Sequence, residues 1–297
     1  MTDRRVLLVA HTGRPDIYAT ARHVKEVLES AKLELLALPG EGSELDLAML
    51  SDAADVAHGD SSPVELILAL GGDGTLLRAA EVARPLRTPV IAINLGRVGF
   101  LAEAEADRLD EVLAALIARK YQRSDRMTID VTIEHDGVVL DTCWALNEVS
   151  VEKATRERIL DVVVEVDGRG VSAFGCDGVL CATPTGSTAY AFSAGGPIMW
   201  PDVEALLVVP SNAHALFARP LVVSPNSTVT IHVDPAGHDA IVACDGRRTH
   251  EVPPGAKVVI RRGEQPVTMI KLGEQPFTDR LVAKFALPVH GWRERRY

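Results

Sequence analysis

The hydrophobic pattern changes once along this chain, near Arg126, and this change limits the possible folds more than any other feature of the sequence. Before it, short runs that are apolar throughout alternate with amphipathic stretches. Strands of that kind, separated by helices, are typical of a parallel sheet covered on both faces. The expected strands are 6–10, 33–38, 64–70 and 89–93, and the expected helices are 17–30, 45–57, 75–82 and 107–118. The pattern therefore predicts a Rossmann-like α/β domain at residues 1–123.

After Arg126, apolar and polar residues alternate in short segments that end in turn signals such as Asp-Gly and Pro-Gly. The expected strands are 127–133, 138–143, 160–166, 229–233, 240–244, 256–260 and 267–270. Short strands at this spacing are typical of an antiparallel sandwich. The second half is therefore predicted to be a β-sandwich-like domain at 124–277, with a short helix inserted at 185–194.

Composition excludes several classes of protein. With 297 residues, 47% of them hydrophobic, the chain is neither a small disulfide scaffold nor a disordered polymer. Its formal net charge of -10 disfavours binding to nucleic acid or to anionic membranes. Its four cysteines lack the spacing of a zinc site or a disulfide framework. The sequence also contains neither a signal-peptide pattern nor a long apolar run, so we expect a cytoplasmic protein.

The strongest candidate site is the segment 71–75, Gly-Gly-Asp-Gly-Thr, between an expected strand and an expected helix. Glycines let the main chain approach a ligand, and the first N–H groups of a helix favour a phosphate. The alternative is a plain turn in which Asp73 caps the helix. Beside a phosphate, an ionised Asp73 needs a cation or a hydroxyl proton between the two groups, so Asp73 would be a metal ligand or a base. The glycines in 94–100 form either a further wall of this site or tight turns.

Two polar segments of the second half are further candidates. Asn147 and Glu148 offer donors and acceptors for a base edge and for ribose hydroxyls, although two polar residues at an exposed strand end explain them equally well. After Asp177, a dense run of small hydroxyl residues at 183–197 supplies side-chain oxygens and open backbone N–H groups. Tyr190, within that run, adds a flat face for stacking. These segments predict a binding site for a nucleotide-like ligand.

Taken in order, these segments resemble the motifs of the NAD kinase family. Residues 71–75 resemble its GGDGT motif, 94–101 its N-x-G-x-x-G-F-L segment, Asn147 and Glu148 its NE motif, and 183–197 its TPTGSTAY region. Diacylglycerol-type lipid kinases and phosphofructokinases use loops related to GGDGT. The specific signal is therefore the order of all four motifs, which covers nearly the whole chain.

The resemblance implies a homodimer or homotetramer that transfers a phosphoryl group from ATP or polyphosphate to the adenosine 2′-hydroxyl of NAD. It also implies a divalent cation, typically Mg2+. It implies Asp73 as the proton acceptor and a C-terminal segment, 278–297, that returns to the first domain. Arg78 would lie near phosphates, and its alternative is a solvated helix residue. The residues implied to bind the substrates are Gly74, Arg78, Asn147, Glu148, Arg158, Asp177, Thr188, Ala189, Tyr190, Ser193 and Asn212.

Two other functions compete with this one. A diacylglycerol-type lipid kinase would share the loop and a β-rich second domain, but the acidic charge and the lack of a basic amphipathic helix disfavour it. A protein that senses NAD(P) without catalysis would be expected to lack the acidic residue in the loop, and Asp73 is present. An enzyme of the NAD kinase type is therefore the preferred interpretation.

Overall fold

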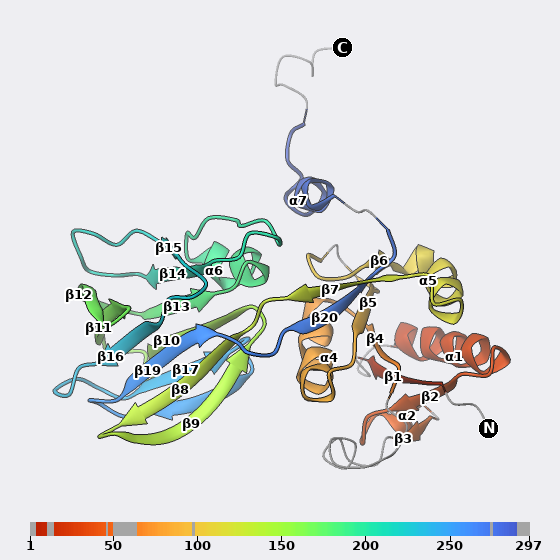
Figure 1. Ribbon diagram of the computed structural model, residues 1–297, viewed down its shortest axis with the longest axis horizontal. Helices are drawn as coiled ribbons and strands as arrows, with labels where there is room; N and C mark the ends of the chain where they lie inside the picture. Colours follow the sequence, from red (N-terminus) through yellow and green to blue (C-terminus); the bar gives the residue numbers. More distant parts are fainter. Residues whose placement is uncertain are drawn as a thin grey trace. The chain divides into compact units, whose positions relative to one another are not determined.

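The chain forms two compact units, of which the first contains Met1–Asp125 and Val267–Tyr297 and the second contains Arg126–Pro266. Figure 1 shows their strands and helices. The structure is a computed structural model, and it describes residues 4–10, 15–45, 47–49, 64–96, 99–273 and 276–289.

The first unit is built on an eight-stranded sheet in the order β3-β2-β1-β4-β5-β20-β7, with β6 paired to β5. From β3 to β5 every neighbouring pair is parallel, and β6 and β20 are also parallel to β5. The strands are β1 Arg5–Ala10, β2 Glu34–Ala37, β3 Ala48–Met49, β4 Leu66–Leu70, β5 Val90–Asn94, β6 Ala104–Glu105, β7 Gln122–Arg126 and β20 Val267–Lys271. This sheet confirms the predicted α/β fold of the first half.

Helices cover both faces of this sheet. Val6 and Leu8 of β1 share one apolar cluster with Ile17 and Leu113, which belong to α1 and α5. The alternate residues of β1 face the opposite side, where α4 packs against β1, β4 and β5 (Figure 1). The helices are α1 Pro15–Ser30, α2 Gly42–Leu45, α4 Asp73–Leu86, α5 Leu109–Ile117 and α7 Phe277–Phe285, with a 3-10 turn at Ala106–Arg108. Strands buried from both sides explain the continuous apolar runs in the sequence.

Two predictions for this unit need correction. Most of the expected helix 45–57 lies outside the described residues, but Ala48–Met49 within it is strand β3, not helix. The expected strand 267–270 exists, but it pairs with β5 of the first sheet instead of joining the second domain. Periodicity predicts that a segment is extended, but it does not identify the neighbouring strand. The second error comes from that limit, whereas the first comes from assigning a helical period to a segment that is extended.

The second unit consists of two six-stranded sheets in which all the pairings are antiparallel. Their orders are β15-β14-β13-β10-β17-β18 and β12-β11-β16-β19-β8-β9. The elements are β8 Ile129–His135, β9 Val138–Ala145, β10 Glu148–Lys153, β11 Leu160–Val166, β12 Arg169–Cys176, β13 Gly178–Ala182, a 3-10 turn at Thr185–Thr188, α6 Tyr190–Ser193, β14 Leu206–Ser211, β15 Leu221–Val223, β16 Val229–Val233, β17 Ala240–Cys244, β18 Arg248–Val252 and β19 Lys257–Arg262. The predicted sandwich is confirmed.

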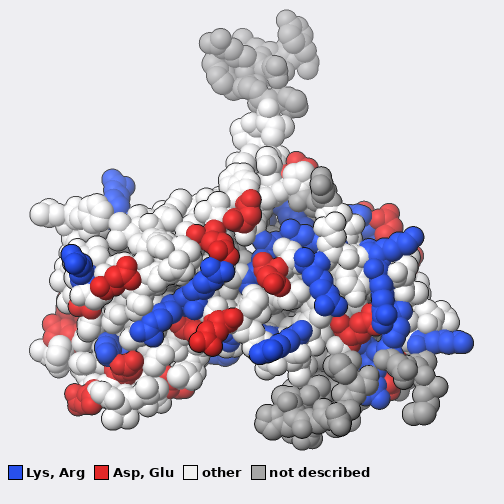
Figure 2. All heavy atoms as spheres, in the orientation of Figure 1, with Lys and Arg blue, Asp and Glu red and all other residues white. Residues whose placement is uncertain are grey.

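Charges of both signs are present on the surface. On the face shown in Figure 2, Lys and Arg side chains lie among Asp and Glu side chains. Opposite charges in such a mixture partly cancel at a distance, so this face presents no uniform field to a polyanion. Among the helices of the described ranges, none combines the length and the apolar character that a membrane crossing requires.

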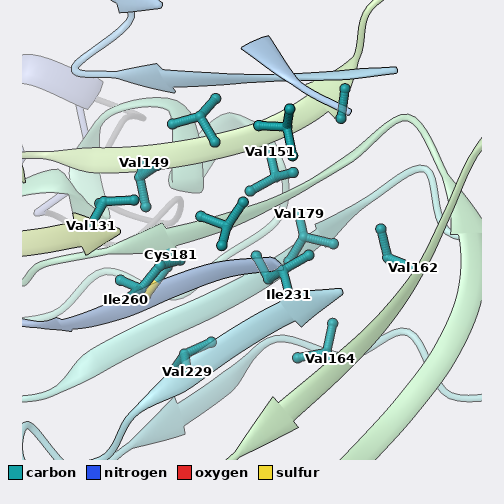
Figure 3. Close-up of a cluster of buried hydrophobic side chains, with 14 of the residues drawn as sticks. Val131, Val149, Val151, Val162, Val164, Val179, Cys181, Val229, Ile231 and Ile260 are labelled. Carbon is teal, nitrogen blue, oxygen red and sulfur yellow. The ribbon is translucent and has the colours of Figure 1, made fainter. Parts of the chain in front are cut away.

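The core of the second unit lies between its two sheets. Val149 and Val179 from one sheet point toward Val131, Ile231 and Ile260 from the other, and all five are buried (Figure 3). On β10 the buried valines alternate with the polar residues Glu148, Ser150 and Glu152, which therefore face away from this core. The sandwich thus carries a polar row on the outer face of one sheet.

Removing core volume should destabilise the second unit. Ile231 is fully buried, and Ile231→Ala should lower the free energy of unfolding by about 2–5 kcal/mol because it leaves a cavity. Val222→Ala, at a position that is 56% exposed on β15, is the matched control and should change it by less than about 0.5 kcal/mol. Urea unfolding followed by tryptophan fluorescence measures both values, since Trp144 and Trp200 lie in this unit. Equal effects from the two variants would contradict the assigned core.

Candidate active site

The GGDGT loop joins the buried strand β4 to the first turn of α4. Gly71 has a φ of +151°, and a Cβ atom there would lie 2.3 Å from Oγ1 of Thr75. Its N–H donates to the carbonyl of Ile93 at 3.0 Å, which fixes the loop beside the end of β5. The loop therefore needs a glycine at position 71 for a steric reason.

Asp73 is held by the second motif of the same unit. Its Oδ2 accepts a hydrogen bond from the N–H of Phe100 at 3.1 Å, and its Oδ1 accepts one from the N–H of Leu101 at 3.2 Å. A Cβ atom on Gly99 would lie 2.3 Å from Oδ1, so any larger residue there would displace the carboxylate. The fold thus brings the GGDGT loop together with Gly99, Phe100 and Leu101.

This arrangement excludes one of the two interpretations of Asp73. The N-cap of α4 is Gly72, and no side chain makes a capping hydrogen bond there, so the interpretation of Asp73 as a helix cap is wrong. An ionised carboxylate has about four lone-pair sites, and the two backbone bonds occupy two of them. The others can accept a hydroxyl proton or bind a cation. Asp73 can therefore be either a base or a metal ligand, and both roles stay open.

Arg78 has close partners within the first unit. Its guanidinium forms an ion pair with Glu41, and its Nη2 donates to the carbonyl of Ala10 at 3.1 Å. Glu41 is itself buried, and its Oε2 accepts the N–H of Ala10 at 3.0 Å. Arg78 is therefore not the solvated helix residue of the alternative interpretation. Its contact with a phosphate stays a prediction, as does that of Gly74, which lies exposed in the first turn of α4.

The NE motif lies at the start of β10, and Asp245 holds its backbone. Oδ1 of Asp245 accepts the N–H of Asn147 at 2.7 Å, and Oδ2 accepts the N–H of Leu146 at 3.0 Å. In return, the N–H of Asp245 donates to the carbonyl of Glu148 at 2.9 Å. An ion pair at 2.8 Å between Asp245 and Arg248 balances the buried charge. In the sequence, Asp245 stands in an Asp-Gly turn signal at 245–246, and nothing there predicts this contact.

Asn147 and Glu148 each carry a buried oxygen that can receive a ligand. Both residues are 6% exposed, and within the described part of the chain Oδ1 of Asn147 and Oε2 of Glu148 have no hydrogen-bond partner. Burial and the nearby charge of Asp245 raise the pKa of Glu148 to about 8, although the backbone N–H of Tyr190 lowers it. At neutral pH Glu148 is therefore largely protonated, and it can donate a hydrogen bond as well as accept one. The interpretation of the pair as an exposed strand end is wrong.

The TPTGSTAY segment packs on the same sheet face. A Cβ atom on Gly186 would lie 2.0 Å from the carbonyl oxygen of Asn147, so this turn passes directly over the NE motif. Burial raises the pKa of Tyr190, although a hydrogen bond between its hydroxyl and the side chain of Ser211 partly lowers it. Ala191 packs with Leu180 in a small apolar cluster on this outer face. The segment is therefore anchored at both of its ends.

Asp177 lies just before β13, at the end of that strand that is away from the NE motif, and its carboxylate has two partners. Its carboxylate accepts a hydrogen bond from Nδ2 of Asn212 at 2.8 Å and pairs with Nζ of Lys153 at 2.5 Å. These bonds lower the pKa of Asp177, the bond from Lys153 having the largest effect. Asp177 and Asn212 were both expected site residues, and the structure brings them together. Lys153 was not among the predicted site residues, because no feature of the sequence distinguishes it from other lysines.

The remaining expected residues lie nearby on the chain. Thr188, Ala189 and Ser193 belong to the anchored segment, half-buried or exposed, so their groups are accessible. Arg158 is different, because it lies in the turn after β10 and lines a hollow of about 250 Å³ with Thr155 and Asp239. No hydrogen bond or ion pair of the described residues joins Arg158 to the NE motif.

Two domain models match this chain, the ATP-NAD kinase N-terminal domain at residues 6–121 and the ATP-NAD kinase C-terminal domain at residues 146–272. The NAD kinase of Rhodococcus erythropolis is 54% identical over 99% of this chain and 97% of its own length. The chain belongs to the NAD kinase family. The NAD kinase of Mycolicibacterium paratuberculosis, also 54% identical, covers 98% of each chain.

Solved structures agree with this membership. An NAD kinase from Archaeoglobus fulgidus in complex with ATP matches 96% of this chain and 100% of its own, with a TM-score of 0.71 and 26% identity. Yeast NADH kinase complexed with NADH matches 97% of this chain and 89% of its own, with a TM-score of 0.86. At 20% identity, the yeast enzyme supports the fold alone. The chain is therefore a phosphotransferase of the NAD kinase family.

The raised pKa of Glu148 predicts how stability depends on pH. Between its ordinary value of 4.5 and about 8, the folded state holds a proton on Glu148 that the unfolded state has lost, so the folded state becomes less stable as pH rises. From pH 6 to pH 8, this group should lower the free energy of unfolding by about 2 kcal/mol. Urea unfolding at the two pH values should show that Glu148→Gln removes this decrease. Glu251→Gln, at an exposed position on β18, should retain it.

The contact between Gly99 and Asp73 predicts a specific loss of activity. Gly99→Ala should displace the Asp73 carboxylate, and a displacement near 1 Å at a reacting group lowers the rate by about 100-fold. The control is Gly170→Ala on β12, where an added Cβ atom meets nothing within 4 Å. Steady-state phosphotransfer assays measure both. Full activity in Gly99→Ala would show that the position of Asp73 is unimportant.

Proposed function

We propose that this protein transfers the γ-phosphoryl group of ATP to the adenosine 2′-hydroxyl of NAD and forms NADP. The observation that supports this most directly is the Asp73 carboxylate, fixed by two backbone N–H groups with lone pairs left over, in a chain that is 54% identical to NAD kinases. The archaeal relative solved with ATP supports ATP as the donor. Polyphosphate stays an alternative donor.

Asp73 accepts the proton of the attacking hydroxyl in this proposal. Phosphoryl transfer depends mainly on positioning and charge neutralisation, so a carboxylate that orients the hydroxyl is sufficient as a base. The two backbone bonds prevent rotation of the carboxylate and keep its remaining lone pairs in one direction. The start of α4 and the adjoining glycines favour the transferred phosphate through free N–H groups. Gly74 and Arg78 act on phosphates in the same proposal.

The second unit supplies the groups that recognise the dinucleotide. Asn147 and a protonated Glu148 offer a buried acceptor and a buried donor to the adenosine and its ribose. Tyr190 offers an exposed ring face for stacking, and Asp177 with Asn212 offers further polar atoms. Thr188, Ala189, Ser193 and Arg158 are proposed to line the same ligand.

A divalent cation such as Mg2+ fits the residues present. Among the described residues, no group of three or more His, Cys, Asp or Glu side chains could hold a metal alone. Mg2+ commonly uses one or two carboxylates together with substrate phosphates, and Asp73 offers one such carboxylate. When bound, the cation would neutralise charge on the donor phosphates. A homodimer or homotetramer in the cytoplasm completes the proposal.

Replacing the carboxylate by an amide tests the role of Asp73. Asp73→Asn should leave a folded protein that binds NAD, but its turnover number should fall by about 100- to 10,000-fold because the proton acceptor is lost. An NADP-dependent dehydrogenase measures NADP formed from NAD, ATP and Mg2+, and calorimetry measures NAD binding. Asp107→Asn, at an exposed position in the first unit, should keep full activity. Full turnover in Asp73→Asn would refute the assignment.

A further inference from the structure

We propose that Arg280 of α7 is a positioning residue for Asp73, acting through the peptide group between Phe100 and Leu101. Nη1 of Arg280 donates to the carbonyl oxygen of Phe100 at 3.2 Å. The N–H of Leu101, in the same peptide group, donates to Oδ1 of Asp73 at 3.2 Å. One planar group thus connects the guanidinium to the carboxylate. The catalytic part of this inference rests on the proposed function.

A cation on the carbonyl strengthens the opposite end of the peptide. Hydrogen bonds in series polarise one another, and a donor that carries a full charge makes the stronger bond. The positive charge of Arg280 therefore makes the N–H of Leu101 a better donor to Asp73. The carboxylate is held more firmly, and its negative charge is partly compensated without a cation in direct contact.

Arg280 is itself fixed by buried partners. Its Nη2 pairs with Oε2 of Glu103 at 3.2 Å, and Glu103 is 6% exposed. Oε1 of Glu103 accepts the N–H of Leu272, which follows β20, at 2.9 Å. The guanidinium fork therefore bridges a buried carboxylate and the carbonyl of Phe100. A flexible surface arginine would not provide such a fixed geometry.

Helix α7 also holds Phe100 through contacts with its aromatic ring. The ring of Phe100 lies 6.1 Å from the ring of Phe277 and 5.6 Å from that of Phe285, measured between centroids. Nζ of Lys284 lies 5.9 Å from the centroid of Phe100. The backbone N–H of Phe100 is the donor to Oδ2 of Asp73. Both backbone bonds to Asp73 therefore come from residues that α7 holds in place.

Nuclear magnetic resonance tests the connection without any assay of activity. In protein labelled with 15N-leucine, the amide proton of Leu101, assigned with Leu101→Met, should move upfield in Arg280→Gln because its hydrogen bond weakens. Asp73→Asn should move the same resonance. Arg119→Gln is the matched control, because it also breaks an ion pair between an arginine and a glutamate, here Glu65. Glu65 precedes β4, whereas Asp73 follows the other end of that strand. A Leu101 resonance unchanged in Arg280→Gln would overturn the proposal.

Kinetics test the consequence for the reaction. Arg280→Gln should lower kcat by about tenfold while KM for NAD changes by less than about twofold, because the substitution affects the reacting carboxylate and not the bound dinucleotide. Arg280→Lys keeps the charge beside Glu103, so its melting temperature should equal that of the unaltered protein. Its single ammonium group cannot reproduce the fork, so its kcat should also fall. Unaltered kcat in both variants would overturn the proposal.

The two experiments also separate this inference from the proposed function. If the unaltered protein forms no NADP, the proposed function fails, and the Leu101 resonance still decides whether Arg280 acts on the Asp73 contact. If NADP forms and the Arg280 variants lose kcat while the Leu101 resonance stays in place, the arginine acts by another route and the proposal is wrong.

Discussion

Two backbone N–H groups hold the Asp73 carboxylate, and the proposed reaction depends on this interaction. It joins the loop after β4 to the segment after β5, and it requires a glycine at position 99. Parallel strands that end at the same edge of a sheet make this meeting possible. In the proposed reaction, a carboxylate fixed by backbone bonds does not have to be reoriented, which reduces the cost of reaching the transition state.

In the second unit, the two-residue period of strand β10 separates core residues from polar residues. On β10 the residues that face inward fill the sandwich core, and those that face outward present Glu148 and its neighbours to the TPTGSTAY segment. A shift of the register by one residue would bury the polar row and expose the valines. The stability of the sandwich and the position of these polar side chains are therefore fixed by the same strand pairing.

Much of this arrangement could be predicted from short stretches of sequence. The strands 160–166, 229–233 and 240–244 were predicted with their observed bounds, because alternation and turn residues are local signals. The loop at Asp73 and the NE motif were also visible locally. Asp245 and Arg280 were not, because their partners lie far away in the sequence and nothing in an Asp-Gly turn or a helical arginine identifies them. Long-range contacts of this kind require the fold.

The insertion of the whole sandwich between β7 and β20 has a consequence for synthesis on the ribosome. The sheet of the first unit receives β20 only after nearly the entire polypeptide has emerged, although its other strands were made early. The sandwich has all of its strands available sooner, since its sequence is continuous. During synthesis the sheet of the first unit therefore lacks the strand that pairs with β5 until β20 has emerged. A chain released before that point would contain a complete sandwich and an incomplete first sheet.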